Sequence, residues 1–88
     1  MSNDLKLYGF DGCPYCQELK ELLDKDNIIY EYIDIDDDKN HEHCKKMFEI
    51  ADSEKVPMFV IGKKIFVPEK SFSTIPEGVE LIKIFLSK

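Results

Sequence analysis

Two cysteines three positions apart, Cys13 and Cys16, are the residues of this chain best suited to chemistry. A Cys-x-x-Cys pair where a strand meets a helix is typical of thiol–disulfide redox sites. Unpaired backbone N–H groups and the positive end of the helix dipole favour a negatively charged sulfur at Cys13. Pro14 suits the first helical turn, because it has no N–H to leave unpaired and its φ is already near helical values. The spacing therefore predicts that Cys13 is the attacking nucleophile and that Cys16, one turn further on, resolves the bond that Cys13 forms.

The rest of the chain divides into strands and helices, which the spacing of apolar residues predicts. The predicted elements are a strand over 5–8, a loop over 9–12, a helix over about 14–24, a strand over 28–35, a helix from near 40 to 51, strands over 58–61 and 64–67, and a last helix from about 75 to 86. The first strand, helix and strand predict a parallel pair with a right-handed crossover. The last two strands, joined by Gly62-Lys63, predict an antiparallel hairpin. The order β-α-β-α-β-β-α predicts one α/β domain over residues 1–88.

Local sequence signals predict which faces of the first two helices are buried and where the last helix starts. Cys16 falls on the apolar side of the first helix, so we expect it to be more buried than Cys13. Cys44 belongs to the apolar stripe of the second helix, which predicts a core thiol. Residues 74–77, Thr-Ile-Pro-Glu, resemble a capping box at the start of the last helix.

The composition limits the partners of this chain. Its 88 residues carry 18 acidic and 12 basic side chains, a net charge of −6 at pH 7. This charge argues against nucleic acid or an anionic membrane surface as the main partner. The first residues contain no basic segment followed by an apolar one, and a Cys-x-x-Cys pair among three cysteines fits a reducing compartment. We therefore expect a cytoplasmic monomer that binds neither membranes nor nucleic acid and holds no metal.

The Cys-Pro-Tyr-Cys motif, with Lys20 four residues later and Val56-Pro57 before the third strand, resembles that of the glutaredoxins. The resemblance covers nearly the whole length and implies a thioredoxin fold, in which a four-stranded mixed sheet is flanked by three helices. It implies that Pro57 follows a cis peptide bond and lies against the dithiol, while Val56 presents its backbone to an extended substrate. It also implies that Tyr15 shapes the cleft beside the thiols.

The same resemblance implies an activity. Cys13 would attack a disulfide or a glutathionylated thiol, and Cys16 or a second glutathione would resolve the mixed disulfide. Glutathione would then be a co-substrate, with disulfide-containing proteins as further partners and no tightly bound cofactor. Pro14 and Lys20 would support the two thiols.

Three departures from the family alter the expected glutathione contacts. Phe10-Asp11 stands where a lysine or arginine is usual, and Lys55 replaces a threonine where it can supply a cation instead. Residues 67–71, Val-Pro-Glu-Lys-Ser, replace a Gly-Gly segment whose backbone N–H groups hold a carboxylate. We expect weaker glutathione binding as a result. The predicted substrate or glutathione contacts are Tyr15, Lys55, Val56, Pro57, Lys70 and Ser71.

Alternatives to a glutathione-dependent enzyme remain open at this point. One is a redoxin that a flavoprotein reductase of the thioredoxin type reduces, and that serves, for example, ribonucleotide reductase. Another is a non-catalytic zinc-binding module in which the dithiol is joined by His41, His43 and Cys44, although two cysteines are only half of a tetrahedral site. A redox-inactive adaptor with the same fold is the third.

Overall fold

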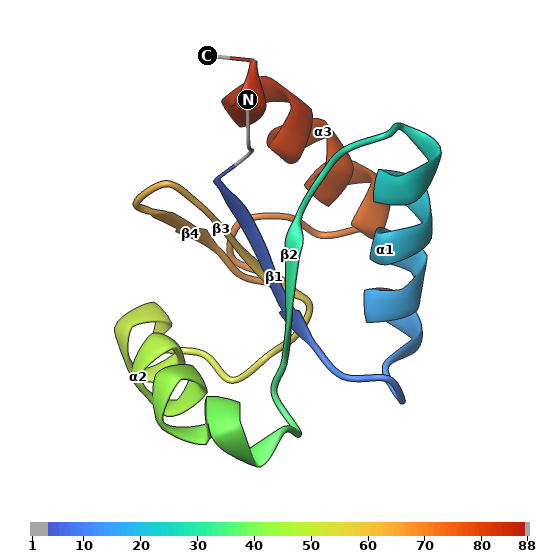
Figure 1. Cartoon of the computed structure of the whole chain (residues 1–88). Coiled ribbons are helices and arrows are strands. Elements are labelled where there is room, and N and C mark those ends of the chain that lie inside the picture. The colour runs from blue at the N-terminus through green and yellow to red at the C-terminus, as the bar shows by residue number, and fades with distance from the viewer. Residues whose placement is uncertain (1–3, 88) are drawn as a thin grey trace.

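A four-stranded sheet with helices on both faces makes up the structure (Figure 1). The computed structural model describes residues 4–87. The elements are β1 (Leu5–Gly9), α1 (Pro14–Lys25), β2 (Glu31–Asp34), the short 3₁₀ helix η1 (Asp38–Asn40), α2 (His41–Ala51), β3 (Met58–Ile61), β4 (Lys64–Phe66) and α3 (Ile75–Leu86). The predicted order of strands and helices is confirmed.

The strands lie in the order β2-β1-β3-β4. β1 runs parallel to β2 and antiparallel to β3, and β3 runs antiparallel to β4. The turn between β3 and β4 is Gly62-Lys63, and Gly62 has a φ of 61°, which glycine adopts without steric penalty. The sheet is therefore mixed, and the predicted fold class is confirmed.

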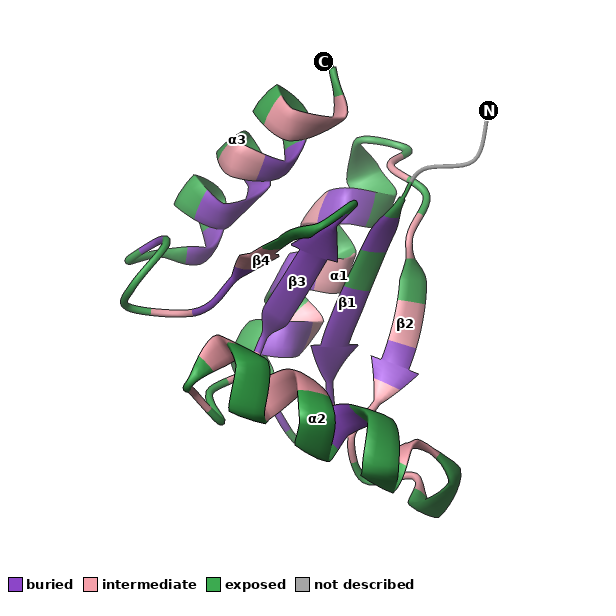
Figure 2. Cartoon of the chain, turned by 90° about the vertical axis from the view of Figure 1, so that its left-hand side faces the viewer, coloured by how far each residue is buried: buried purple, intermediate pink, exposed green. Residues whose placement is uncertain are grey.

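The two faces of the sheet hold two separate cores. α1 and α3 cover one face and α2 covers the other (Figures 1 and 2). Because side chains alternate along a strand, Leu5 and Leu7 of β1 pack on the α1 side while Tyr8 packs on the α2 side. β3 is buried along its whole length, since it has a strand on each side and helices above and below (Figure 2).

The second strand is shorter than the sequence predicted. β2 covers Glu31–Asp34 rather than 28–35, because the preceding residues complete the end of α1. Asn27 has a φ of 59°, and the N–H of Ile28 donates to the carbonyl of Leu23 at 2.9 Å. The predicted strand ends were therefore wrong, although the strand itself and its place beside β1 are confirmed.

Two further local predictions are confirmed, the core position of Cys44 and the capping box. Cys44 lies in the core under α2, with Ile33 of β2, whereas Tyr32 packs toward the α1 face. The capping box is present, because the N–H of Glu77 donates to Thr74 Oγ1 and the N–H of Thr74 donates to Glu77 Oε1. None of the helices between residues 4 and 87 has both the length and the apolar composition that a membrane span needs.

Candidate active site

Cys13 is the last residue before α1, and its sulfur is directed at the start of the helix. Its extended backbone, with φ −93° and ψ 110°, lets the sulfur accept a hydrogen bond from the N–H of Cys16 at 3.1 Å. Pro14 takes the first helical position, as predicted. The N–H of Cys13 donates to the carbonyl of Phe10 at 3.1 Å and closes the preceding turn. The sulfur thus occupies the place of a helix-capping oxygen, where negative charge is stabilised.

Both sulfurs are largely enclosed by the protein. Cys13 is 5% exposed and Cys16 is fully buried, so the predicted order of burial is confirmed, while Cys13 offers only a narrow edge to a substrate. Burial, followed by the hydrogen bond with Cys13, raises the pKa of Cys16 to about 12, while the backbone N–H of Phe10 and the ammonium of Lys20 act in the opposite direction. Both cysteines are free thiols in this structure. Cys16 therefore keeps its proton at neutral pH.

The Val56–Pro57 peptide bond is cis, as the resemblance implied. β3 begins at the next residue, Met58, which pairs with Tyr8 near the end of β1. Pro57 therefore lies at the same end of the sheet as the loop that carries Cys13. The resemblance implied that this turn lies against the dithiol, and the strand register places it at that end of the sheet.

A hollow of about 200 Å³ lies beside α1 at this end of the sheet. It brings together Tyr15, Val56 and Pro57, three of the predicted contact residues. The residues that line it are Tyr15, Val56, Pro57, Pro68, Glu69, Phe72, Ser73, Thr74 and Ile75. Tyr15 is 63% exposed, so its ring forms an open wall of the hollow. The hollow has the position and the mixed apolar and polar lining of a substrate cleft.

The two predicted lysines lie at a neighbouring hollow, which shares Pro68 and Glu69 with the first. Lys55 forms an ion pair with Glu69, a residue that lines both hollows. Lys70 donates to the backbone carbonyl of Asp52 at 3.0 Å and lies 3.9 Å from its carboxylate. Both cations are therefore already neighbours of carboxylates from this chain.

Ser71 lies apart from the cleft. Its hydroxyl accepts a hydrogen bond from the N–H of Val67 at 3.1 Å, and its own N–H donates to the carbonyl of Val67. It lines a different hollow, between β4 and α3, with Phe66 and Phe85 among its neighbours. The structure gives Ser71 the role of closing the loop after β4 and does not bring it to Tyr15.

The carboxylate of Glu77 accepts hydrogen bonds from backbone N–H groups at the start of α3. Glu77 Oε1 accepts from the N–H of Ser73 and from that of Thr74, each at 3.0 Å. Ser73 and Thr74 both line the hollow beside Tyr15. The capping box signalled Glu77 in the sequence, but only the fold shows that the two amides it holds belong to the cleft.

Two further residues of the site were missed at the sequence level. Glu69, which pairs with Lys55, lies in a loop that carries no regular periodicity, so no signal predicted its partner. Tyr32 lies in β2, where alternation predicted its face but not its neighbours. Lys20, named from the motif alone, lies with its Nζ 4.1 Å from the ring centre of Tyr32.

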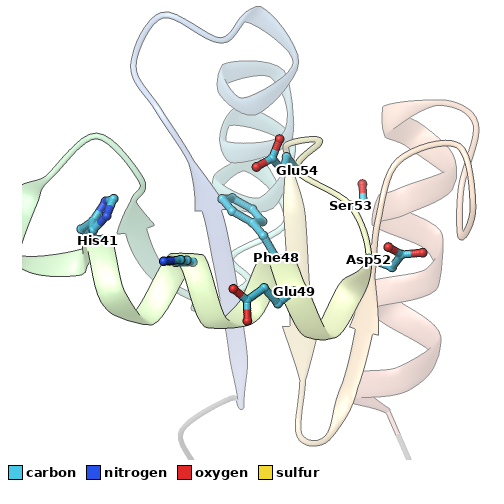
Figure 3. A pocket seen from close by; sticks show the side chains of 7 residues that line it. His41, Phe48, Glu49, Asp52, Ser53 and Glu54 are labelled. Atoms are coloured by element: carbon cyan, nitrogen blue, oxygen red, sulfur yellow. The ribbon is translucent and has the colours of Figure 1, made fainter.

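A larger hollow, of about 630 Å³, lies along α2 and contains no cysteine (Figure 3). Its lining includes His41 and the carboxylates of Glu49, Asp52 and Glu54. Between residues 4 and 87, no group of three or more histidine, cysteine or acidic side chains has an arrangement that could hold a metal ion. The zinc alternative thus gains no support from the geometry, and the dithiol end of the sheet is the candidate active site.

Comparisons with known proteins agree with this location. A family model described as glutaredoxin matches residues 5–66, which include the dithiol and the Val56-Pro57 turn. Glutaredoxin 1 of Rickettsia prowazekii is 36% identical over 55 residues, which make up 62% of this chain and 58% of that protein. Glutaredoxin 1 of Rickettsia typhi is 52% identical over 29 residues, 33% of this chain and 28% of that protein. The chain thus spans less than two thirds of the length of these relatives.

Solved structures show the same fold over nearly the whole chain. A glutaredoxin from Archaeoglobus fulgidus matches with a TM-score of 0.70 and 26% identity, over 92% of this chain and 87% of that one. A buckwheat glutaredoxin–glutathione complex matches with a TM-score of 0.73 and 20% identity, over 97% of this chain and 78% of that one.

Proposed function

Because the chain belongs to the glutaredoxin family and has the thioredoxin fold, we propose that it is a thiol–disulfide oxidoreductase that works through Cys13 and Cys16. The observation that carries this proposal is the hydrogen bond from the N–H of Cys16 to Cys13 Sγ, 3.1 Å long, at the start of α1. The thiolate is the nucleophile in disulfide exchange, and a backbone donor at the positive end of a helix stabilises that charge. The proposed substrates are protein disulfides and mixed disulfides of glutathione.

The proposed reaction consists of two exchanges. The Cys13 thiolate attacks one sulfur of the substrate disulfide, a new S–S bond forms, and the other substrate sulfur leaves as a thiolate that takes up a proton. Cys16 then gives up its proton and attacks Cys13 Sγ. The second substrate thiol is released and a Cys13–Cys16 disulfide remains. Two electrons have passed to the substrate, and a thiol reductant must return two electrons to the pair.

The hollow beside Tyr15 supports binding of an extended substrate segment. Val56 and Pro57 form one side of it, and the exposed ring of Tyr15 forms another. Phe72 and Ile75 add apolar surface at its base. A substrate segment that lies along Val56 would bring its disulfide to the exposed edge of Cys13.

The charges around this hollow bear on the source of electrons. Glutathione carries two carboxylates, and groups that would hold them already hold carboxylates of this chain, since Lys55 pairs with Glu69 and the amides of Ser73 and Thr74 bond Glu77. This competition favours a second candidate, a redoxin that a flavoprotein reductase reduces and that serves a protein disulfide such as that of ribonucleotide reductase. Glutathione stays the first candidate, because the family and the fold of the buckwheat complex support it.

A coupled assay tests the proposal and separates the two electron sources. Oxidation of NADPH is followed with a disulfide substrate, either with glutathione and glutathione reductase or with thioredoxin reductase alone. We expect turnover in at least one system and its loss in Cys13→Ser. Turnover of Cys13→Ser at the wild-type rate would refute the oxidoreductase. Cys16→Ser should keep removal of glutathione from a mixed disulfide and lose reduction of protein disulfides.

The ion pair of Lys55 gives a sharper test of glutathione binding. Glu69→Gln frees Lys55, and we expect the KM for a glutathione mixed disulfide to fall about two- to fivefold, because an exposed ion pair is worth up to about 1 kcal/mol. Glu54→Gln makes the same charge change one residue before Lys55 and serves as the matched control. An equal change in both variants would show that only net charge matters.

A further inference from the structure

The hydroxyl of Tyr32 is the one buried side-chain N or O atom, among residues 4–87, that has no hydrogen-bond partner. Leaving such a group unpaired costs stability, so an orphaned hydroxyl calls for an explanation. Tyr32 lies in β2 opposite Leu7, with its ring on the α1 face of the sheet. The hydroxyl is therefore held inside the face that carries the dithiol.

Gly9 makes the space that this hydroxyl shares with Cys16. A Cβ added to Gly9 would lie 2.7 Å from Cys16 Sγ and 3.4 Å from the hydroxyl of Tyr32. The sulfur and the hydroxyl thus border the same small gap at the end of β1. The ammonium of Lys20 lies over the Tyr32 ring, with its Nζ 4.1 Å from the ring centre.

The hydroxyl keeps its proton and can donate it in a hydrogen bond. Burial, with the charges of Cys16, Asp34, Asp11 and Cys13, raises the pKa of Tyr32 to about 12, so the proton stays on the oxygen. No carbonyl, carboxylate or imidazole in the described part of the chain accepts that proton. A negatively charged sulfur at Cys16, which borders the same gap, would be a new acceptor.

The second exchange of the proposed reaction creates that acceptor. Cys16 must lose its proton before it can attack Cys13, and its burial opposes this loss. The thiolate form would then sit in a nearly dry site, where the backbone N–H of Phe10 and the ammonium of Lys20 favour its charge. A hydrogen-bond donor beside the sulfur would offset part of the free-energy cost of forming this buried thiolate.

We propose that Tyr32 donates a hydrogen bond to the Cys16 sulfur as it becomes a thiolate, with Lys20 supporting the same charge, and that this contact sets the rate of resolution. The inference rests on the proposed oxidoreductase function. In the step it assists, Cys16 passes its proton to the departing substrate sulfur, the bond from Cys13 to that sulfur breaks, and the Cys13–Cys16 bond forms. Tyr32 keeps its own proton throughout.

The test follows the two exchanges separately. The reduced protein is mixed in a stopped-flow instrument with an excess of an aromatic disulfide that releases a coloured thiol at each exchange. Cys13 releases the first equivalent and Cys16 the second. In Tyr32→Phe we expect the first phase to be unchanged and the second to slow roughly tenfold, the effect of losing one hydrogen bond to a charged group. The pH dependence of the second phase should also move to higher pH.

Two controls separate this role from a structural one. Tyr30→Phe makes the same change two residues earlier on the same face of the sheet, and both phases should keep their wild-type rates. Tyr32→Phe should need at least as much urea to unfold as the wild type, because it removes an unpaired buried hydroxyl. Lys20→Met should slow the second phase as well, by a smaller factor.

The outcomes are distinguishable. An intact first phase with an unchanged second phase in Tyr32→Phe overturns this inference alone. Equal slowing in Tyr30→Phe does the same, since it would point to general repacking of the strand. Absence of the first phase in the wild type would overturn the proposed function, and the inference with it.

Discussion

The two faces of the sheet each bury a cysteine and a tyrosine hydroxyl but treat them differently. On the α2 face, Cys44 lies within the helix in the core, and the hydroxyl of Tyr8 bonds His43 Nε2 at 2.7 Å. On the α1 face, Cys16 lies one turn from the helix start, and the hydroxyl of Tyr32 has no partner between residues 4 and 87. Burial is the main cause that raises the pKa of each tyrosine to about 12.

This difference teaches that position, rather than residue type, gives a thiol or hydroxyl its role. Cys44 is the fourth residue of α2, inside the helix, and its side chain packs in the core with Tyr8 and Ile33 and does not cap the helix. A thiol at the start of α1 meets donors that the helix leaves unpaired. On the α2 face, the hydroxyl of Tyr8 is hydrogen-bonded and contributes to stability. On the α1 face, the hydroxyl of Tyr32 has no partner among the described residues and can bond the thiolate that we propose forms at Cys16 during exchange.

The largest expected effect comes from removing one thiol from each face. Cys13→Ser should reduce disulfide exchange to the uncatalysed rate, because an alcohol does not form an S–S bond. Cys44→Ala should keep wild-type exchange and lose about 1 kcal/mol of unfolding free energy, as expected for a modest core truncation. The measurements are disulfide reduction and urea unfolding. Equal loss of activity in both variants would break the comparison between the faces.

A methyl group at Gly9 should be the next largest effect. Gly9→Ala places a Cβ 2.7 Å from Cys16 Sγ, and overpacking of this kind costs about 1–3 kcal/mol. Gly62→Ala serves as a reference, because nothing lies within 4 Å of its Cβ and its cost of about 1 kcal/mol arises from the positive φ. Urea unfolding of the reduced proteins measures both. A smaller loss for Gly9→Ala than for Gly62→Ala would contradict the close packing inferred at the dithiol.

Alkaline pH should weaken the fold through both faces. The thiol of Cys16 has its pKa raised from 9.0 to about 12, so above pH 9 the unfolded chain loses this proton first and stability falls as pH rises. Each such group contributes up to about 1.4 kcal/mol per pH unit. Burial also raises the pKa of Cys44, by a smaller amount. The urea midpoint of unfolding should fall between pH 8 and pH 11, a range of about 3 units. This fall should be reduced more by Cys16→Ser than by Cys44→Ser.

The smallest effect should distinguish the two tyrosines. Tyr8→Phe removes the hydrogen bond to His43 and should cost about 1 kcal/mol of unfolding free energy. Tyr32→Phe removes a hydroxyl without a partner and should cost nothing or stabilise the protein. Thermal or urea unfolding of the two variants under the same conditions makes the comparison. A greater loss for Tyr32→Phe would show that its hydroxyl is already bonded in the resting protein.

Much of the fold could be predicted from local sequence because its signals are local. Several signals depend on residues only a few positions apart: the apolar runs of β1 and β3, the apolar stripe with Cys44, the glycine turn at 62 and the capping box at Thr74. The start of β2 could not be predicted, because the N–H groups of Asn27 and Ile28 bond carbonyls at the end of α1 and these residues do not join the strand. β2 begins only at Glu31, where its pairing with Lys6 of β1 starts, and a sequence window does not contain this register.

The candidate site divides in the same way. The sequence by itself determined where the proposed nucleophile lies, since a helix start, a proline and two cysteines in four residues are enough to place Cys13 beside free backbone donors. The motif also named Lys20 and the turn at Pro57.

Only the tertiary structure decided what surrounds the two sulfurs. It brought Glu69 to Lys55, the Glu77-bonded amides to the cleft, and the hydroxyl of Tyr32 to the gap left by Gly9. These contacts join residues that are many positions apart or on different elements, and each depends on strand register and helix packing. Such geometry exists only once the sheet has formed, which is why the sequence determined the position of the two thiols while the fold decided which charges and hydroxyls lie around them.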